Sequence, residues 1–231
     1  KKKKKIIVFD NAFHGRTIAG ILAGSSNKHR EGFLPHAKAK GGFIRIEFNN
    51  LKSLEKVIDS QTAGVFIEPI QGEGGINVAT LKFLKEIRKI CNRKKILMAV
   101  DEVQCGIGRT GKFFAHEWSY IKPDLLSTAK GLGGGFPIGA ILLRKKIAMQ
   151  IKPGSHGSTF GGNQLASTVS LAVIKEVSKK KTLNNVINIG NYIKIEINKL
   201  IKKNPHVLEG IFGKGLMLGL KCKVSNIEFV E

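Results

Sequence analysis

Two side chains stand out as able to do chemistry, the carboxylate of Asp101 and the amine of Lys130. Asp101 follows the apolar run Ile96–Val100, which has no polar alternation and so predicts a strand buried on both faces of a parallel sheet. Lys130 follows a second expected strand, Asp124–Thr128, and precedes a glycine run. Ligands of open α/β sheets bind just beyond the carboxyl ends of strands. The pair therefore predicts a cofactor with a cationic group, held by Asp101 and linked to Lys130.

The surroundings of Lys130 distinguish it from the other lysines of the chain. It lies between two apolar stretches and beside glycines, which allow the backbone to approach a ligand closely. We expect its amine to be desolvated, and a desolvated lysine amine is a nucleophile at neutral pH. Lys130 is thus the predicted point of covalent attachment.

A nucleotide site is one alternative. The segment Gly106–Lys112 nearly completes the phosphate-binding motif GxxxxGK[ST], and Ile96–Glu102 resembles the strand that carries a magnesium-binding aspartate. However, residue 113 is phenylalanine, so the hydroxyl that binds magnesium is missing. The glycine loop also follows the acidic strand directly, without the expected strand–loop–helix order. Both departures disfavour a P-loop nucleotide-binding protein.

A metal site is a second alternative that the spacing disfavours. The histidines show neither HxH nor HxxxH spacing, and the cysteines Cys91, Cys105 and Cys222 are far apart with no CxxC pair. We therefore predict no metal. An odd number of unpatterned cysteines also indicates a reducing, cytoplasmic compartment.

The chain is strongly basic, with a formal net charge of +22 over 231 residues. Such a charge can indicate a nucleic-acid or anionic-membrane partner. Here the basic residues are mostly lysines on expected helix surfaces, with no arginine-rich patch interleaved with aromatics. The apolar runs are too short to span a membrane. We therefore expect neither nucleic acid nor a membrane as a partner.

The elements that position these residues alternate between strands and helices. Strands are expected at Ile6–Phe9, Phe43–Phe48, Gly64–Glu68, Ile96–Val100, Asp124–Thr128 and Ile138–Leu143, and helices after Asn50, after Thr80, at Gln164–Lys179 and at Asn184–Lys203. This order predicts a three-layer α/β protein with a mainly parallel sheet. Short strands are expected again in the tail after Pro205. We therefore expect a large domain at 1–203 and the start of a smaller domain at 204–231.

Several stretches, in the same order along nearly the whole chain, resemble the class III pyridoxal-phosphate-dependent aminotransferases, and most closely their acetylornithine aminotransferase branch. They are Phe13–Thr17, Glu68–Gly75, Asp101–Gln104, Gly106–Gly111, Ala129–Gly131, Gly134–Gly139 and His156–Asn163. The resemblance implies the large domain of a fold type I enzyme, with pyridoxal 5'-phosphate as cofactor.

The resemblance also implies roles in cofactor binding. Lys130 would bind the cofactor covalently and then move a proton, and Asp101 would keep the ring nitrogen protonated so that the ring withdraws electrons. Gln104 would donate a hydrogen bond to the ring's phenolic oxygen. Val103 would pack under the ring, and Phe13 would stack on its opposite face.

The substrate side is implied in the same way. The planar fork of Arg16 would bind a substrate carboxylate. Glu73 resembles the glutamate that pairs with a later arginine of the family, which lets one pocket take both a basic amine and 2-oxoglutarate. Ser158 would border the substrate, and Thr159 would reach the cofactor phosphate of a second subunit in a homodimer with shared active sites.

The implied reaction moves the terminal amino group of N-acetylornithine to 2-oxoglutarate in arginine biosynthesis, with succinyl-diaminopimelate of lysine biosynthesis as a related donor. Ornithine and 4-aminobutyrate stay open as alternative donors.

Two residues depart from the family pattern: Gln164, where proline is common, and Cys105, where threonine is frequent. The family's upstream Gly-Thr phosphate loop and its downstream arginine segment are not found, so we expect a fragment that carries the core of the site.

Overall fold

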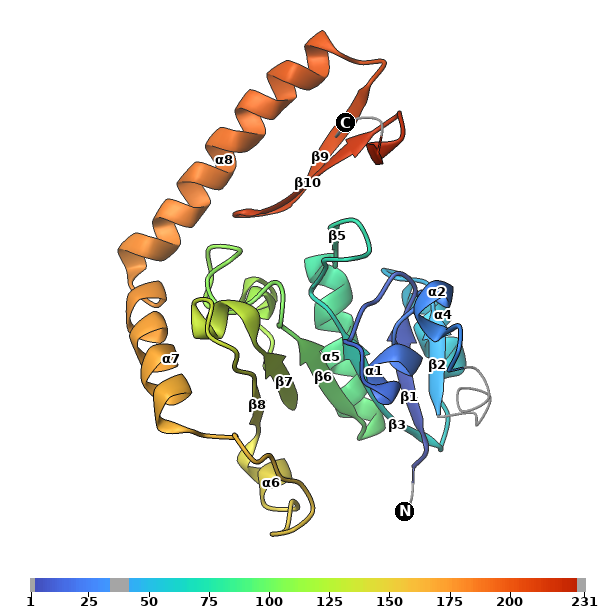
Figure 1. The fold of residues 1–231 in the computed structure, drawn as a ribbon. Helices are drawn as coiled ribbons and strands as arrows, with labels where there is room; N and C mark the ends of the chain where they lie inside the picture. The colour runs from blue at the N-terminus through green and yellow to red at the C-terminus, as the bar shows by residue number, and fades with distance from the viewer. Residues whose placement is uncertain (1–2, 34–41, 228–231) are drawn as a thin grey trace.

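The computed structural model describes residues 3–33 and 42–227, which fold around a six-stranded sheet in the order β2-β1-β3-β6-β7-β8 (Figure 1). The strands are β1 (Lys5–Phe9), β2 (Phe43–Ile46), β3 (Thr62–Ile67), β6 (Leu97–Asp101), β7 (Leu125–Thr128) and β8 (Ala140–Leu143). Neighbouring strands pair in parallel, except that β7 and β8 are antiparallel. The predicted mainly parallel sheet is confirmed, with small shifts at the strand ends.

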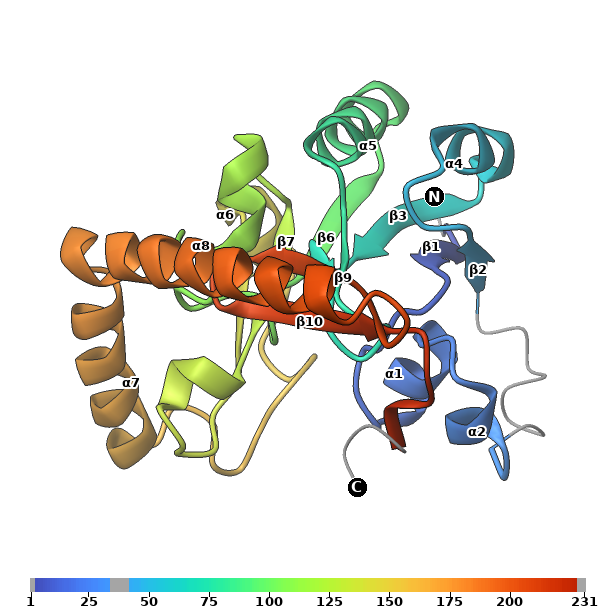
Figure 2. The same cartoon turned by 90° about the horizontal axis from the view of Figure 1, so that it is seen from above.

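Helices lie on both faces of this sheet, which confirms the three-layer α/β architecture (Figure 2). The helices α4 (Leu51–Val57) and α5 (Leu81–Lys94) lie on one face, and α1 (Ile18–Ala23) and α2 (Asn27–Arg30) lie on the other. The predicted starts of α4, after Asn50, and of α5, after Thr80, are confirmed. The side chain of Asn50 accepts a hydrogen bond from the Ser53 N–H, and that of Thr80 accepts one from the Phe83 N–H.

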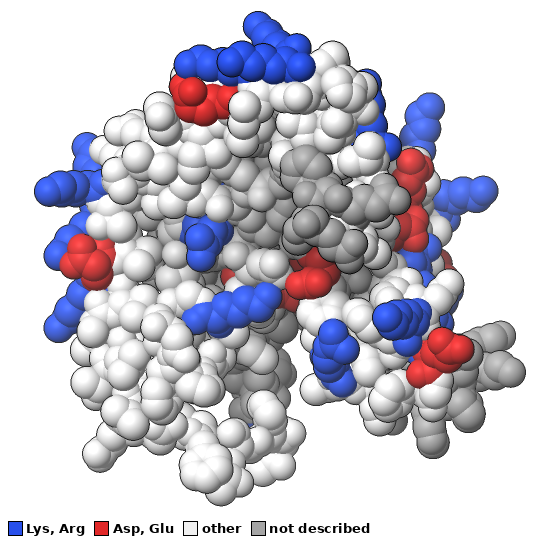
Figure 3. Space-filling model, turned by 45° about the horizontal axis from the view of Figure 1, so that its top comes forward, with Lys and Arg blue, Asp and Glu red and all other residues white. Residues whose placement is uncertain are grey.

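Basic side chains are spread over the surface. On the face shown in Figure 3, Lys and Arg form separate spots with Asp and Glu between them. This dispersion agrees with the expectation that the lysines occupy solvated faces. No helix within residues 3–33 and 42–227 is both long enough and apolar enough to cross a membrane.

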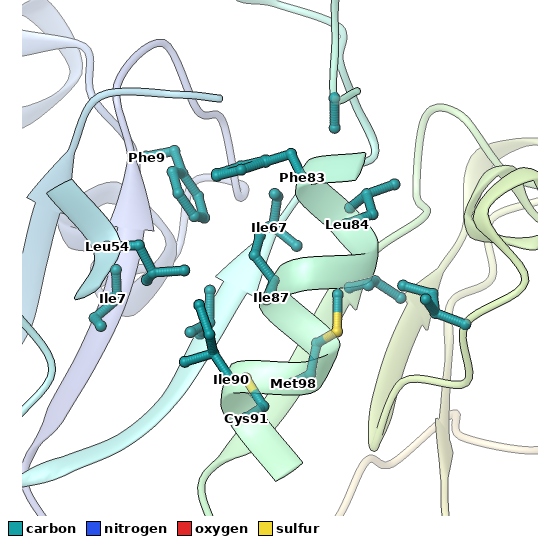
Figure 4. Close-up of a cluster of buried hydrophobic side chains, with 14 of the residues drawn as sticks. Ile7, Phe9, Leu54, Ile67, Phe83, Leu84, Ile87, Ile90, Cys91 and Met98 are labelled. Atoms are coloured by element: carbon teal, nitrogen blue, oxygen red, sulfur yellow. The ribbon is translucent and has the colours of Figure 1, made fainter. Parts of the chain in front are cut away.

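The main core lies between the sheet and the helices α4 and α5 (Figure 4). Along α5, Phe83, Ile87 and Cys91 recur every four residues, so they share one face of the helix and are buried. They join Ile67 and Met98 from the sheet in one apolar cluster. Burial of each of the Phe, Ile and Met side chains stabilises the fold by about 1.5–3 kcal/mol. The position of Asp101 is therefore fixed by the strand that this core holds.

The prediction that the strand before Asp101 is buried on both faces is wrong. Met98 and Val100 are fully buried, whereas Leu97 is 42% exposed. Leu97 and Ala99 line an apolar hollow on the other face of the sheet, together with Phe66, Leu125 and Ile141 among others. Alternate residues of a strand point to opposite faces. Within the described residues, helices cover only one of these faces at this end of the strand.

After β8 the chain leaves the sheet and returns over its carboxyl edge (Figure 1). The elements are α6 (Lys145–Ala148), α7 (Gln164–Val177), α8 (Lys180–Lys203), β9 (Leu208–Lys214) and β10 (Met217–Cys222). The last helix begins earlier than expected and ends before Pro205, as predicted. In the tail, β9 and β10 pair as an antiparallel hairpin, while residues 228–231 lie outside the described residues. Two smaller strands, β4 (Ile70–Gln71) and β5 (Asn77–Val78), also pair antiparallel.

Candidate functional site

The carboxyl ends of the parallel strands bring together residues that are far apart in the sequence. Phe13 and His14 lie in the loop after β1, Glu68 follows β3, Asp101 ends β6, and Lys130 lies after β7. The register pairs Asp101 of β6 with Ser127 of β7. Because parallel strands end at one edge of the sheet, these side chains lie around one candidate site, and three of them, Phe13, Asp101 and Lys130, are residues that the sequence analysis named.

Asp101 is held by two hydrogen bonds. Its Oδ1 accepts one from the Val103 N–H at 3.1 Å, and its Oδ2 lies 2.8 Å from Nδ1 of His14. The side chains of Asp101 and His14 are only 9% and 1% exposed. The His14 ring also stacks on Phe66, with ring centroids 4.0 Å apart. A buried carboxylate in one fixed orientation is suited to hold a cationic ring nitrogen.

Lys130 points its amine at Gln104. Its Nζ donates a hydrogen bond to Oε1 of Gln104 at 2.9 Å. The backbone of Lys130 has φ of 45°, in the left-handed region that residues other than glycine seldom adopt. Such strain clusters at functional positions. The expectation that this lysine is desolvated is wrong for the described chain, because its side chain is exposed and no described segment covers it.

Glu102, next to Asp101, points the opposite way and is fully buried. Its carboxylate accepts hydrogen bonds from the backbone N–H groups of Ala115 and His116 at 2.9 and 2.8 Å, and it lies 2.9 Å from Nδ1 of His116. These bonds anchor the turn that begins at Asp101. They also tie this turn to the short 3-10 helix Ala115–Ser119, so that residues 106–112 lie between the two. This glycine segment is therefore a loop between two anchors, without the long helix that follows a P-loop.

Glu68 is a second buried carboxyl group at this edge. Its Oε2 accepts a hydrogen bond from the Phe13 N–H at 3.0 Å. The pKa of Glu68 is raised to about 8; burial is the largest cause, the hydrogen bond from Phe13 opposes the rise, and the nearby Asp101 carboxylate adds to it. The sequence analysis did not single out Glu68 or His14.

The predicted substrate-side residues lie in two loops beside this site. Arg16, in the loop after β1, is exposed, and its guanidinium lies 5.8 Å from the ring centroid of Phe13. Glu73, in the loop after β4, is also exposed. Both side chains are therefore accessible to a ligand.

The whole chain, residues 1–231, matches the family model of the class-III aminotransferases. The chain belongs to the class III aminotransferases. This membership confirms the family that the sequence motifs predicted.

Curated relatives of this class III chain are named acetylornithine aminotransferase. The enzyme of Aquifex aeolicus is 47% identical over 230 residues, which is 100% of this chain and 58% of the relative. The enzyme of Mesorhizobium japonicum is 46% identical over 222 residues, which is 96% of this chain and 55% of the relative. The chain thus spans little more than half the length of these relatives.

Solved structures of the family share the fold. An ornithine aminotransferase from Toxoplasma gondii matches with a TM-score of 0.89 and 33% identity, covering 96% of this chain and 52% of that one. An acetylornithine aminotransferase from Elizabethkingia anophelis matches with a TM-score of 0.80 and 36% identity, covering 97% and 52%. These matches confirm the expected fold.

Ser158 and Thr159 do not join the site within one class III chain. Because β8 runs antiparallel to β7, it carries the chain to the opposite edge of the sheet. Both residues lie exposed in the segment between α6 and α7.

The two departures from the family pattern do not disturb the fold. Gln164, which stands where proline is common, begins α7, and the Asn163 side chain caps this helix by accepting a hydrogen bond from the Ala166 N–H. Cys105 is buried with its Sγ 3.2 Å from Glu102, and burial raises its thiol pKa, which fits a packing role.

Unpartnered polar atoms at the carboxyl edge indicate that this class III chain binds a ligand there. Within the described residues, the buried atoms His14 Nε2, Ser127 Oγ and Thr128 Oγ1 have no hydrogen-bond partner. Buried polar groups are otherwise almost always paired. Together with the fixed Asp101 carboxylate and the Lys130 amine, they suit a polar aromatic cofactor with a cationic ring nitrogen. No group of three or more His, Cys, Asp or Glu side chains in residues 3–33 and 42–227 could hold a metal ion.

Proposed function

We propose that this chain carries the cofactor-binding core of a pyridoxal-phosphate-dependent aminotransferase that transfers the terminal amino group of N-acetylornithine to 2-oxoglutarate. The observation that carries the proposal is the convergence of Asp101 and Lys130 at one edge of the sheet, with Asp101 bonded to His14 and Lys130 bonded to Gln104. Identities of 46 and 47% to curated acetylornithine aminotransferases support this donor. The corresponding pathway is arginine biosynthesis.

The residues at the edge suit this cofactor. Pyridoxal phosphate supplies an electron sink when bound, because its protonated ring nitrogen draws electrons from the reacting carbon. Asp101 would keep that nitrogen protonated, since the bond to His14 holds its carboxylate in one orientation. Gln104 would orient the phenolic oxygen, and Phe13 and Val103 would pack on the two ring faces.

Lys130 would have two tasks. Its amine would attach the cofactor covalently until the substrate amine takes its place. The freed amine would then carry a proton from the substrate carbon that bears the amino group to the aldehyde carbon of the cofactor. The hydrogen bond to Gln104 directs the amine toward the site before the reaction begins. The left-handed backbone places this side chain where the strand and the glycine run meet.

The substrate side involves two loops and a second subunit. Arg16 would bind a substrate carboxylate through two parallel hydrogen bonds, and Glu73 would pair with an arginine outside this chain. We place Ser158 and Thr159 in the site of a partner subunit in a homodimer. In support, Met149, Ile151 and Phe160 near them are 72, 52 and 81% exposed, and a partner would cover these apolar side chains.

The remaining assignments concern organisation and compartment. We assign residues 1–203 to the large domain and 204–231 to the start of a small one, since the hairpin of β9 and β10 pairs apart from the main sheet. We assign the protein to the cytoplasm, because Cys91, Cys105 and Cys222 are free thiols. We assign it no nucleic-acid partner, in keeping with the dispersed charge of Figure 3.

The test compares amine donors on the natural full-length protein. The protein is loaded with pyridoxal phosphate and mixed with N-acetylornithine, succinyl-diaminopimelate, ornithine or 4-aminobutyrate without an oxo acid. Absorbance then follows conversion of the cofactor from its aldehyde to its amine form. We expect the fastest conversion with N-acetylornithine. Faster conversion with ornithine would overturn the donor, and no conversion with any donor would overturn the reaction.

A further inference from the structure

Glu68 connects two loops at the carboxyl edge of the sheet. The first loop is residues 10–17, after β1, and the second loop is residues 72–76, between β4 and β5. Glu68 is 5% exposed, and its two carboxyl oxygens face different loops. Oε2 accepts a hydrogen bond from the Phe13 N–H of the first loop at 3.0 Å, and Oε1 accepts a longer one from the Gly72 N–H of the second loop at 3.5 Å. One side chain thus bridges both loops.

The two loops also meet at other points, which makes the bridge part of a close fit. The Gln71 side chain, at the end of β4 just before the second loop, is 1% exposed and donates a hydrogen bond to the Asp10 carbonyl oxygen at 2.6 Å. Gly74 lies so close to Asn11 that a Cβ at residue 74 would collide with the Asn11 carbonyl oxygen. The loops are therefore packed backbone against backbone, and a shift of one loop must move the other.

Each loop carries one of the two exposed charged residues assigned to the substrate. Arg16 lies three residues beyond Phe13, and Glu73 directly follows Gly72. Neither side chain forms an ion pair within the described residues. Their separation is therefore set by the loop backbones and not by an ion pair of either side chain.

We propose that Glu68 is a positioning residue that sets the separation of Arg16 and Glu73, and with it the fit of substrates that carry carboxylates. This inference rests on the proposed function. Its physical basis is that a buried acceptor bonded to two backbone N–H groups fixes both loops relative to β3.

The first test measures amide hydrogen exchange in the natural full-length protein without cofactor. Glu68→Ala should speed exchange of the Phe13 and Gly72 amides about tenfold or more, since both lose their acceptor. Glu68→Gln keeps one carbonyl oxygen, so it should leave one of the two amides protected. The matched control is Asp124→Asn, which alters a carboxyl group that is 8% exposed at the opposite edge of the sheet. It should leave both amides unchanged.

The second test separates positioning from a general folding role. In the loaded enzyme, Glu68→Ala should raise KM for the amine donor and for 2-oxoglutarate about tenfold, roughly the effect of one net hydrogen bond. In Glu68→Ala, kcat should fall by a smaller factor than KM rises. In Glu68→Gln, KM should lie between the values of the wild type and Glu68→Ala, and in Asp124→Asn it should equal the wild-type value. Unchanged KM in Glu68→Ala, or unchanged exchange of both amides, overturns the proposal. If the wild-type enzyme fails to transaminate, the proposed function is overturned. The hydrogen-exchange test does not depend on activity and would still show whether Glu68 holds the two loops.

Discussion

The bond between His14 and Asp101 gives the most direct test of how the site is built. His14→Phe keeps an aromatic ring to stack on Phe66 but removes the Nδ1 donor, which lies 2.8 Å from Oδ2 of Asp101. Asp101 then keeps only the bond from the Val103 N–H. A hydrogen bond to a charged group stabilises the folded state by about 1.5–3 kcal/mol, and a buried polar group that loses its partner destabilises it by a similar amount. We therefore expect His14→Phe to lower the free energy of unfolding by about 2–3 kcal/mol.

A double-mutant cycle isolates this interaction. Free energies of unfolding in urea are measured for the wild type, His14→Phe, Asp101→Ala and the double variant, all without cofactor. The coupling between the two sites should be about 1.5–3 kcal/mol, because both side chains are buried and in direct contact. The control pair His14→Phe and Asp124→Asn should be additive. A coupling below about 0.5 kcal/mol would refute the reasoning, because distant independent sites show no more than that.

Three further predictions concern single side chains. Lys130→Ala should abolish covalent attachment of pyridoxal phosphate while the fold is kept, which borohydride reduction and peptide mapping would check; label on another lysine would remove the assignment. Arg16→Lys keeps the charge but loses the planar fork, so KM for 2-oxoglutarate should rise about tenfold while cofactor affinity is unchanged in an absorbance titration; equal loss of both would point to folding instead. The pKa of Glu68 is raised from 4.5 to about 8, so the native state binds this proton more tightly than the unfolded state. Stability should therefore fall as pH rises from about 4.5 to about 8 and then level off, and Glu68→Gln should flatten this part of the unfolding profile.

The sequence predicted the parts of the site that depend on chain order. Asp101 and Lys130 each follow an apolar run, and the sheet topology then brings strand ends together whatever their separation along the chain. The starts of α4 and α5 were also predictable, because Asn50 and Thr80 cap them through contacts only three residues away. Local chemistry and alternation were sufficient for these features.

The parts that sequence could not predict depend on contacts between distant residues. His14 meets Asp101 across 87 residues, and Glu68 meets Phe13 across 55. Neither pairing leaves a local pattern, although a histidine next to Phe13 at a strand end was a usable signal. An apolar run also does not reveal which face of a strand a helix covers, which is why Leu97 was expected to be buried. Exposure of Lys130 has the same origin, since covering a side chain requires a segment from elsewhere.

The left-handed backbone of Lys130 also bears on which residue the fold favours at this position. A residue other than glycine pays about 1–2 kcal/mol for that conformation, whereas glycine adopts it freely. Glycine at residue 130 would therefore relieve strain in the same step that removes the amine. Under the proposed function, the amine offsets this cost. Folding alone would therefore favour glycine at residue 130, so the amine is the one property of Lys130 that the fold does not require.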